Sequence, residues 1–188
     1  MTGQPDFFGT PPSLPEGLRY RAELISAAEE AGLRARFEAL PFQQFEFHGF
    51  LGKRRVVSYG WRYDFNEGGL KPTDPIPEFL LSVRGRAAAF AARPQDDFQQ
   101  ALVTEYSPGA TIGWHRDRSV FGDVVGISLL APWTFRLRRK AGSKWERASL
   151  IAEPRSAYLL SGPSRTEWEH SIPALEELRY SITFRTMR

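Results

Sequence analysis

Cysteine is absent from the 188 residues, which excludes disulfide bonds, thiolate zinc sites and cysteine nucleophiles together. Histidine is scarce, so any histidine chemistry must use His48, His115 or His170. No apolar run approaches the ~20 residues that a membrane-spanning helix needs, so no membrane contact is expected. The N-terminal residues lack both a basic start and a continuous apolar stretch, so we do not expect a secretory signal. These absences together favour a cytoplasmic protein.

The composition is typical of one globular domain. Hydrophobic residues make up 41% and charged residues 25%, which is close to the globular average and argues against disorder. The net charge of +3 permits a polyanionic partner without requiring one. Residues 1–17, rich in glycine, proline and polar side chains, are expected to form an irregular leader. Residues 18–188 are expected to form a single domain, and the protein is expected to be a monomer.

Hydrophobic spacing predicts helices early in the chain and strands later. Part of residues 18–40 is expected to be helical, with Ser26 as the N-cap and Glu29 completing a capping box. Residues 56–59 are expected to form a strand, and residues 78–92 a second helix. Six further short strands are predicted over residues 100–106, 124–130, 134–139, 147–151, 157–160 and 179–185. This order predicts an α+β fold whose core is a β-sandwich or barrel.

The last predicted strand has an unusual polar face. Alternation along it separates polar residues from apolar ones, giving Arg179, Ser181, Thr183 and Arg185 on one face and Tyr180, Ile182 and Phe184 on the other. Facing water, the polar side chains would belong to an ordinary solvated strand. Facing a barrel interior, the two arginines would need anionic partners, and a guanidinium matches a carboxylate in shape. The strand therefore indicates either acidic side chains or a small dianion beside Arg179 and Arg185.

The segment GWHRD contains His115 and Asp117, which an extended chain would place on the same side. That spacing alone is weak evidence, because a surface hydrogen-bonded pair gives the same pattern. His170 follows in the segment EWEHSI, and alone it would be an ordinary half-buried histidine. Two histidines and one carboxylate together match the facial triad of non-haem Fe(II) oxygenases, which leaves coordination positions open. A bidentate 2-oxo acid and O2 would fill them, and the two arginines suit a dianionic 2-oxoglutarate.

Four segments of the chain carry a wider likeness, in the order VTEYSPGATIGWHRD, FGDVVGISLLAPWTFRLRR, EHSI and RYSITFR. They resemble the AlkB family of 2-oxoglutarate/Fe(II) dioxygenases, and weaker similarity extends the resemblance over residues 18–188. The resemblance implies a double-stranded β-helix (jelly roll) core with supporting N-terminal helices. It also implies Fe(II), 2-oxoglutarate and O2 as the cofactors.

The resemblance assigns roles to individual residues. It implies that His115, Asp117 and His170 hold the iron and form the catalytic centre. It implies that Arg179 pairs with the distal carboxylate of 2-oxoglutarate. Arg185 would then lie near the carboxylate that chelates the metal and near Asp117.

Four further positions complete the expected site. By the same resemblance, the Tyr106 hydroxyl donates to 2-oxoglutarate. Ser181 and Thr104 replace asparagines that are common in the family, and both can still form hydrogen bonds in the cofactor site. Ser119 stands where members that repair nucleobases often carry a carboxylate. It is therefore expected near the substrate, where its identity leaves base recognition open.

The expected reaction is O2-dependent hydroxylation of a substrate C–H bond, and on an N-methyl group the product would release formaldehyde. An alkylated base in DNA or RNA would have to be flipped out of its stack to reach the iron. Tyr59, Trp61 and Tyr63 are the candidate stacking residues, although each alone is equally typical of a strand. Basic residues within 53–55 and 136–144 are candidates for phosphate contacts, although charge runs are more often solvated faces.

Two alternatives stay open at this point. The same iron chemistry would also serve a protein side chain or a small molecule, because the substrate is selected by the N-terminal loops. A catalytically silent binding domain would keep the fold without the reaction. The complete triad and both arginines count against the silent domain, because a dead site tolerates the loss of a ligand.

Overall fold

The computed structural model of the chain describes residues 14–47 and 50–188. His48 and most of the leader expected over residues 1–17 lie outside these ranges. Regular structure begins with strand β1 (Leu18–Arg21). Within the described ranges, the model contains no helix with the length and apolar character needed to cross a membrane.

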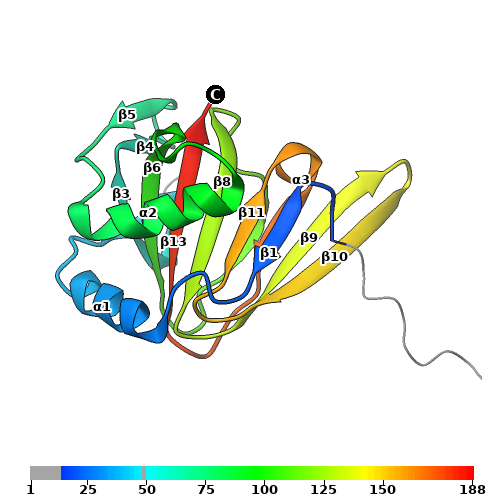
Figure 1. Cartoon of the computed structure of the whole chain (residues 1–188). Coiled ribbons are helices and arrows are strands. Elements are labelled where there is room, and N and C mark those ends of the chain that lie inside the picture. The colour runs from blue at the N-terminus through cyan, green and yellow to red at the C-terminus, as the bar shows by residue number, and fades with distance from the viewer. Residues whose placement is uncertain (1–13, 48–49) are drawn as a thin grey trace, which may run out of the picture.

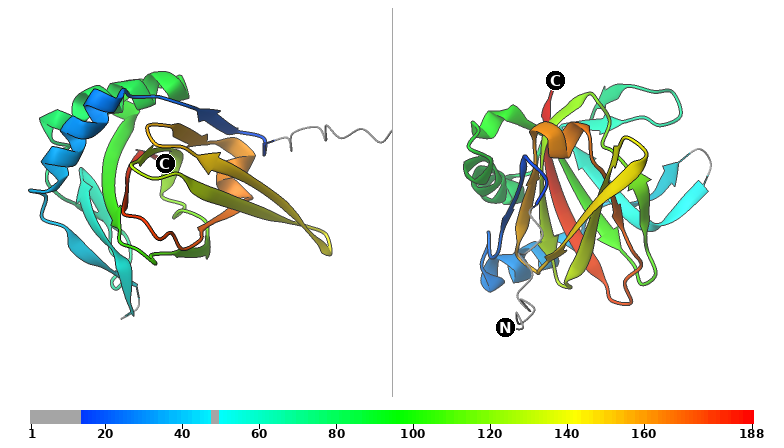
Figure 2. Two further views of the ribbon diagram at one scale, coloured as in Figure 1. Left: turned by 90° about the horizontal axis from the view of Figure 1, so that it is seen from below. Right: turned by 90° about the vertical axis from the view of Figure 1, so that its right-hand side faces the viewer.

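Two antiparallel sheets form the core, and they curve around a common interior when viewed end-on (Figures 1 and 2). In the described chain the larger sheet consists, in spatial order, of β1, β11 (Ala157–Leu160), β8 (Phe121–Leu129), β13 (Arg179–Met187), β6 (Phe98–Tyr106), β3 (Phe50–Tyr59) and β2 (Gln43–Phe47). The smaller sheet consists of β10 (Lys144–Ala152), β9 (Trp133–Ala141), β12 (Glu169–Ile172) and β7 (Ile112–His115). Strands β4 (Trp61–Tyr63) and β5 (Leu70–Pro72) pair separately as a short ribbon.

Two helices, α1 (Ala27–Phe37) and α2 (Glu78–Ala91), cover the outer face of the larger sheet (Figure 2). The predicted capping box starts α1: the Ser26 hydroxyl accepts from the Glu29 backbone N–H, and the Glu29 carboxylate accepts from the Ser26 backbone N–H. The apolar residues of β13 lie beneath these helices, where the rings of Phe37 and Tyr180 have centroids 5.3 Å apart. The apolar face predicted for the last strand therefore packs against the two helices.

The α+β fold predicted from the sequence is confirmed, and each of the six short strands predicted after residue 98 is present. Four of them contain the whole predicted range and extend beyond it, β11 has the predicted bounds, and β8 begins three residues earlier and ends one residue earlier than expected. Residues 18–21 were expected within a partly helical region, and the structure corrects this. Leu18 pairs with Leu160 of β11, so a contact distant in sequence makes this segment a strand. Two short helical pieces, η1 (Gln95–Asp97) and α3 (Gly162–Thr166), link strands of the core.

The interior between the sheets contains an aromatic layer that depends on one glycine. Gly126 of β8 lies directly opposite Tyr158 of β11, and a Cβ added at Gly126 would lie 2.2 Å from the tyrosine ring. Tyr158 in turn packs on Phe135 with ring centroids 4.5 Å apart. The bare backbone at Gly126 therefore gives Tyr158 the space to lie between the sheets.

We predict that Gly126→Ala lowers the free energy of unfolding by about 1–3 kcal/mol, because the added methyl group displaces the buried Tyr158 ring. Urea denaturation measures this change. Gly32→Ala is the matched control, since no atom lies within 4 Å of a Cβ added there on α1. The control is expected to stabilise the protein by about 0.5–1 kcal/mol through better helix propensity. Equal unfolding free energies for the two variants would contradict the prediction.

Candidate active site

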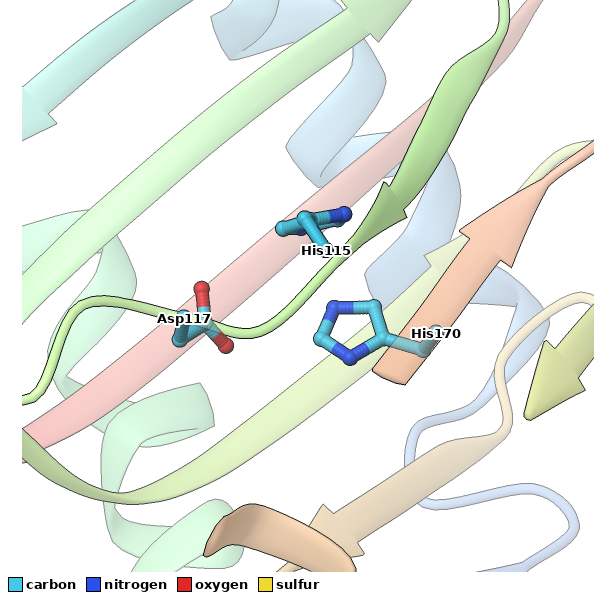
Figure 3. A group of neighbouring side chains, drawn as sticks. All are labelled: His115, Asp117 and His170. Atoms are coloured by element: carbon cyan, nitrogen blue, oxygen red, sulfur yellow. The ribbon is translucent and has the colours of Figure 1, made fainter. Parts of the chain in front are cut away.

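Three side chains from two distant parts of the chain meet on the inner side of the smaller sheet (Figure 3). His115 ends β7, and His170 lies directly opposite it on β12, with ring centroids 4.3 Å apart. Asp117 follows His115 by two residues, and one ligand atom from each of the three residues lies within 4.8 Å of the others. The arrangement predicted from His-x-Asp and a distant histidine is thus present as a group that can hold a metal ion.

Hydrogen bonding orients the first histidine toward this group. The Nδ1 atom of His115 lies 2.9 Å from the Gly113 carbonyl oxygen. Because a carbonyl oxygen only accepts, Nδ1 carries the proton and Nε2 is left as the ligand atom. His170 packs against the Phe135 ring, with centroids 5.3 Å apart. Both imidazoles are therefore held in place before any metal binds.

Electrostatics favour the protonation states that a metal ion requires. Burial alone would raise the pKa of Asp117, but the charges of Arg185 and the two histidines lower it well below the ordinary value. The Arg185 Nη2 atom lies 3.1 Å from the Asp117 Oδ1 atom, and both side chains are largely buried. Burial lowers the pKa of His170 to about 3. The carboxylate is therefore ionised and the imidazole neutral at pH 7, as metal ligands must be.

The arginine face of β13 points into the interior, as the sequence predicts. Arg179 is only 1% exposed, and its guanidinium lies 4.2 Å from the ring centroids of both Tyr106 and Trp133. Its Nε and Nη1 atoms, like the Nε atom of Arg185, have no hydrogen-bond partner within the described ranges. Such buried donors need an anionic acceptor. A dicarboxylate such as 2-oxoglutarate fits this donor set.

The remaining residues expected at the cofactor site lie on β6 and β13 around the same point. Tyr106 pairs in register with Arg179, and Thr104 pairs with Ser181. The Ser181 hydroxyl donates to the Tyr106 hydroxyl at 3.5 Å. Burial would raise the pKa of Tyr106, but the guanidiniums of Arg179 and Arg54 lower it below its ordinary value. The phenol therefore lies between two cations.

An open cavity of about 1410 Å³ contains the triad, with Thr104, Tyr106 and Arg185 in its wall. Arg179 and Ser181 are not wall residues; they lie behind Tyr106. Of the aromatic candidates, Tyr59 and Tyr63 line the cavity. Trp61, which pairs with Pro72 in the β4–β5 ribbon, is not a wall residue. Ser119 is also absent from the wall and is exposed in the segment that leads from Asp117 to β8.

Arg54 is a cavity residue that the sequence analysis missed as an individual site. It lies opposite Tyr106 in the β3–β6 register, and its guanidinium stacks 3.8 Å from the centroid of the Phe45 ring. Burial lowers its pKa. Strand alternation separates it from its neighbour Arg55, whose guanidinium binds Glu105 on the opposite face through two hydrogen bonds of 2.8 Å. The basic cluster expected to contact phosphates is therefore divided between two faces.

The mouth of the cavity carries interleaved aromatic and arginine side chains. The Phe65 ring lies with its centroid 5.5 Å from that of Phe45 and 5.1 Å from that of Tyr63. The Arg118 guanidinium lies 4.9 Å from the Tyr63 ring centroid and 5.2 Å from that of Phe65. Only Tyr63 was among the predicted residues. The other rings come from β2 and from the segment after β4, and no local pattern brings those together.

A two-sheet antiparallel core with two histidines and an aspartate on one inner face defines a class, the oxygenases that use 2-oxoglutarate and Fe(II). The chain belongs to the 2OG-Fe(II) oxygenase superfamily, whose family model matches residues 21–185. The chain is therefore an oxygenase of this superfamily, as predicted, and the family implies Fe(II) and 2-oxoglutarate as its cofactors.

Individual relatives confirm the predicted likeness to AlkB proteins. The chain is 29% identical over 181 residues to the Arabidopsis thaliana "Alkylated DNA repair protein ALKBH8 homolog", covering 84% of this chain and 51% of the relative. It is 26% identical over 167 residues to the Xenopus tropicalis "tRNA (carboxymethyluridine(34)-5-O)-methyltransferase alkbh8", covering 86% of this chain and 26% of the relative. The chain thus spans about half of the first relative and a quarter of the second.

Solved structures confirm the predicted double-stranded β-helix. The fold is similar to that of OsALKBH1, with a TM-score of 0.68 and 18% identity, covering 93% of this chain and 98% of that one. It is also similar to a prolyl-4-hydroxylase of Pseudomonas putida, with a TM-score of 0.61 and 14% identity, covering 93% and 94% of the two chains. At these identities the likeness concerns the fold alone.

We predict that His115→Ala and Asp117→Ala weaken Mn(II) binding by more than the ~10–100-fold that follows loss of a supporting group. Only Asp117→Ala should also lower the free energy of unfolding, by about 3–5 kcal/mol, because it leaves Arg185 buried without its carboxylate. Titration calorimetry and urea denaturation measure the two effects. Glu177→Ala, which removes an exposed carboxylate, is the control and should change neither. Unaltered Mn(II) affinity in either ligand variant would show that the group does not bind metal.

Proposed function

We propose that the protein oxidatively removes N-alkyl groups from nucleobases in DNA or RNA. The observation that carries this proposal is the cavity beside the triad, whose mouth alternates aromatic rings with guanidiniums. Aromatic rings stack on bases and guanidiniums pair with phosphates, so this composition suits a flipped nucleotide. The printed name of the Arabidopsis relative, an alkylated DNA repair protein, supports the same substrate class.

Within this proposal the iron is held by His115, Asp117 and His170. Bound Fe(II), together with 2-oxoglutarate and O2, would supply the oxidising chemistry that hydroxylates a C–H bond. Arg185 keeps Asp117 ionised through its contact with the carboxylate. The Gly113 carbonyl fixes the tautomer of His115.

A second set of residues would bind the co-substrate. Arg179 and Arg185 offer buried donors to the two carboxylates of 2-oxoglutarate. Tyr106 adds a hydroxyl that lies between cations, and Ser181 and Thr104 lie next to it on neighbouring strands. Phe135 and Tyr158 of the aromatic layer form an apolar part of the same cavity wall, and contacts between charges are stronger in a region of low dielectric.

Charge balance extends the argument to the substrate. Three guanidiniums, those of Arg54, Arg179 and Arg185, lie around Tyr106 and the triad, and the Asp117 carboxylate acts on Arg54 and Arg185. Asp117 and a bound 2-oxoglutarate dianion would together supply three negative charges, which balances the three guanidiniums but leaves the charge of a bound Fe(II) ion in excess. Arg54 has no ion pair with any residue that the structure describes, and it lines the open cavity. A substrate with an anionic group, such as a nucleotide phosphate, would balance it.

The direct test is formaldehyde release from short single-stranded DNA and RNA that carry one N-methylated base. With Fe(II), 2-oxoglutarate and O2 present, we expect release from at least one methylated oligonucleotide above that from its unmethylated twin. The Asp117→Ala variant provides the background. Succinate formation without formaldehyde from any of the oligonucleotides would reject nucleobase dealkylation and favour the same chemistry on another substrate.

We further predict that Arg54→Ala raises the KM for a methylated oligonucleotide by about tenfold or more, the effect of losing ~1.5–3 kcal/mol from a charged hydrogen bond. The dissociation constant for 2-oxoglutarate, measured by calorimetry without substrate, should change much less. Lys53→Ala is the matched control, because the adjacent Lys53 is exposed outside the cavity. A weakened 2-oxoglutarate affinity with an unchanged KM would instead assign Arg54 to the co-substrate.

A further inference from the structure

The smaller sheet has a second face, opposite the one that carries His115 and His170. Strand pairing places four basic side chains on this outer face, namely Arg136, Arg138 and Lys140 of β9 and Arg147 of β10. The register also places Glu169 of β12 there, directly opposite Arg138. We call this the outer basic face. Its four cations and one carboxylate give it a net charge of +3, which equals the net charge of the whole chain.

Two tryptophans belong to the outer basic face and fix its central arginine. The Arg138 guanidinium lies 4.4 Å from the ring centroid of Trp114 and 4.5 Å from that of Trp145. Its Nε atom donates to the Glu169 carboxylate at 2.7 Å. Trp145 nevertheless remains 41% exposed. The Arg138 guanidinium stacks on the Trp145 ring, and the exposed part of the indole can stack on an aromatic group of a ligand.

The other cations of this face have no acidic partner in the described ranges. Arg136 donates through Nε to the Ser171 hydroxyl at 3.1 Å, and its guanidinium lies 5.4 Å from the Trp114 ring centroid. Lys140 and Arg147 are exposed and form no ion pair with any residue that the structure describes. Three basic groups are therefore available to bind an anion from solution.

On the opposite side of the same β9–β10 hairpin, a basic side chain is paired with carboxylates. There, Arg139 donates to Glu146 and Glu167, each at 2.7 Å, and stacks 5.1 Å from the Trp168 ring centroid. Its charge is balanced by carboxylates from two other segments. Lys140 and Arg147 on the outer side of the same hairpin have no such carboxylate partner among the residues that the structure describes.

The outer basic face also adjoins the cavity that contains the triad. Trp114, which stacks with Arg136 and Arg138, is at the same time a residue of the cavity wall. From there the face crosses four strands, which is about 14 Å at the usual strand spacing, and ends on the hairpin that projects from the body (Figures 1 and 2). A polymeric ligand with one of its units in the cavity would continue over the outer basic face.

We propose that the outer basic face binds the backbone of single-stranded nucleic acid, with Arg136, Lys140 and Arg147 on phosphates and Trp145 stacked on a base. The choice of nucleic acid rests on the proposed function. The contacts themselves rest on the unpaired charges and on the exposed indole of Trp145, which together match the phosphates and bases of a nucleic acid. Phosphate contacts of this kind position the chain without reading its sequence.

The test measures binding of fluorescein-labelled oligo(dT) by anisotropy over a range of salt concentrations, without iron or 2-oxoglutarate. We expect Lys140→Glu with Arg147→Glu to lower the affinity by about tenfold or more. The slope of log K against log salt should fall by about 1.4, since each lost phosphate contact on a single strand contributes ~0.7. The matched control is Arg21→Glu with Arg36→Glu, an equal charge change at exposed sites on β1 and α1, away from the outer basic face. Equal affinity and slope for the two double variants would overturn the proposal.

Two more measurements keep the result interpretable. The neutral pair Lys140→Gln with Arg147→Gln should lose the same salt slope, and thermal melting checks that each variant is folded. Trp145→Ala should weaken oligo(dT) binding while leaving binding of inorganic polyphosphate unchanged. Equal weakening of both ligands, or no weakening of either, rejects the stacking contact and with it a nucleic-acid surface. Because this binding assay involves no turnover, oligo(dT) binding that depends on the outer basic face, together with no formaldehyde from the methylated oligonucleotides, would reject the proposed function alone.

Discussion

The ion pair between Arg185 and Asp117 connects the fold to the site. It joins the last strand of the larger sheet to the segment that follows β7 in the smaller one, and both charges are removed from water. A buried carboxylate stays ionised only beside a cation, and a buried guanidinium needs an anion. The pair therefore places a charged oxygen beside the two imidazoles of the triad. The two sheets, the helices that cover one of them and the aromatic layer between them all serve to hold that arrangement.

What the sequence could predict follows from the range of each interaction. The capping box at Ser26, the polar alternation of β13 and the short strands after residue 98 depend on neighbours within a few residues, and these were recognised. Strand β1 and the cavity residues Arg54 and Phe45 depend on partners far along the chain. Leu18 becomes a strand residue because Leu160 pairs with it. Arg54 becomes a cavity residue because β3 pairs with β6, which places it opposite Tyr106. The triad was predictable because a family motif records its long-range contact.

Alternation along the smaller sheet separates two kinds of chemistry. His170 points inward while its neighbours Glu169 and Ser171 point outward, where they meet Arg138 and Arg136. A strand has a period of two, so a metal ligand is flanked by residues of the opposite face. Contacts on the outer face therefore hold the strand that carries the ligand. One thin sheet can in this way present a metal group to the interior and a basic surface to solvent.

The distribution of satisfied and unsatisfied groups explains why this interior suits a charged co-substrate. Arg179 has already lost its water, and stacking between Tyr106 and Trp133 holds its guanidinium in place without satisfying every N–H. The folded protein has thus met the desolvation cost of this cation before a ligand arrives. An incoming carboxylate then gains charged hydrogen bonds in a region of low dielectric, with little further loss of side-chain freedom. Stability given up by leaving donors unpaired is recovered as affinity for the dianion that pairs them.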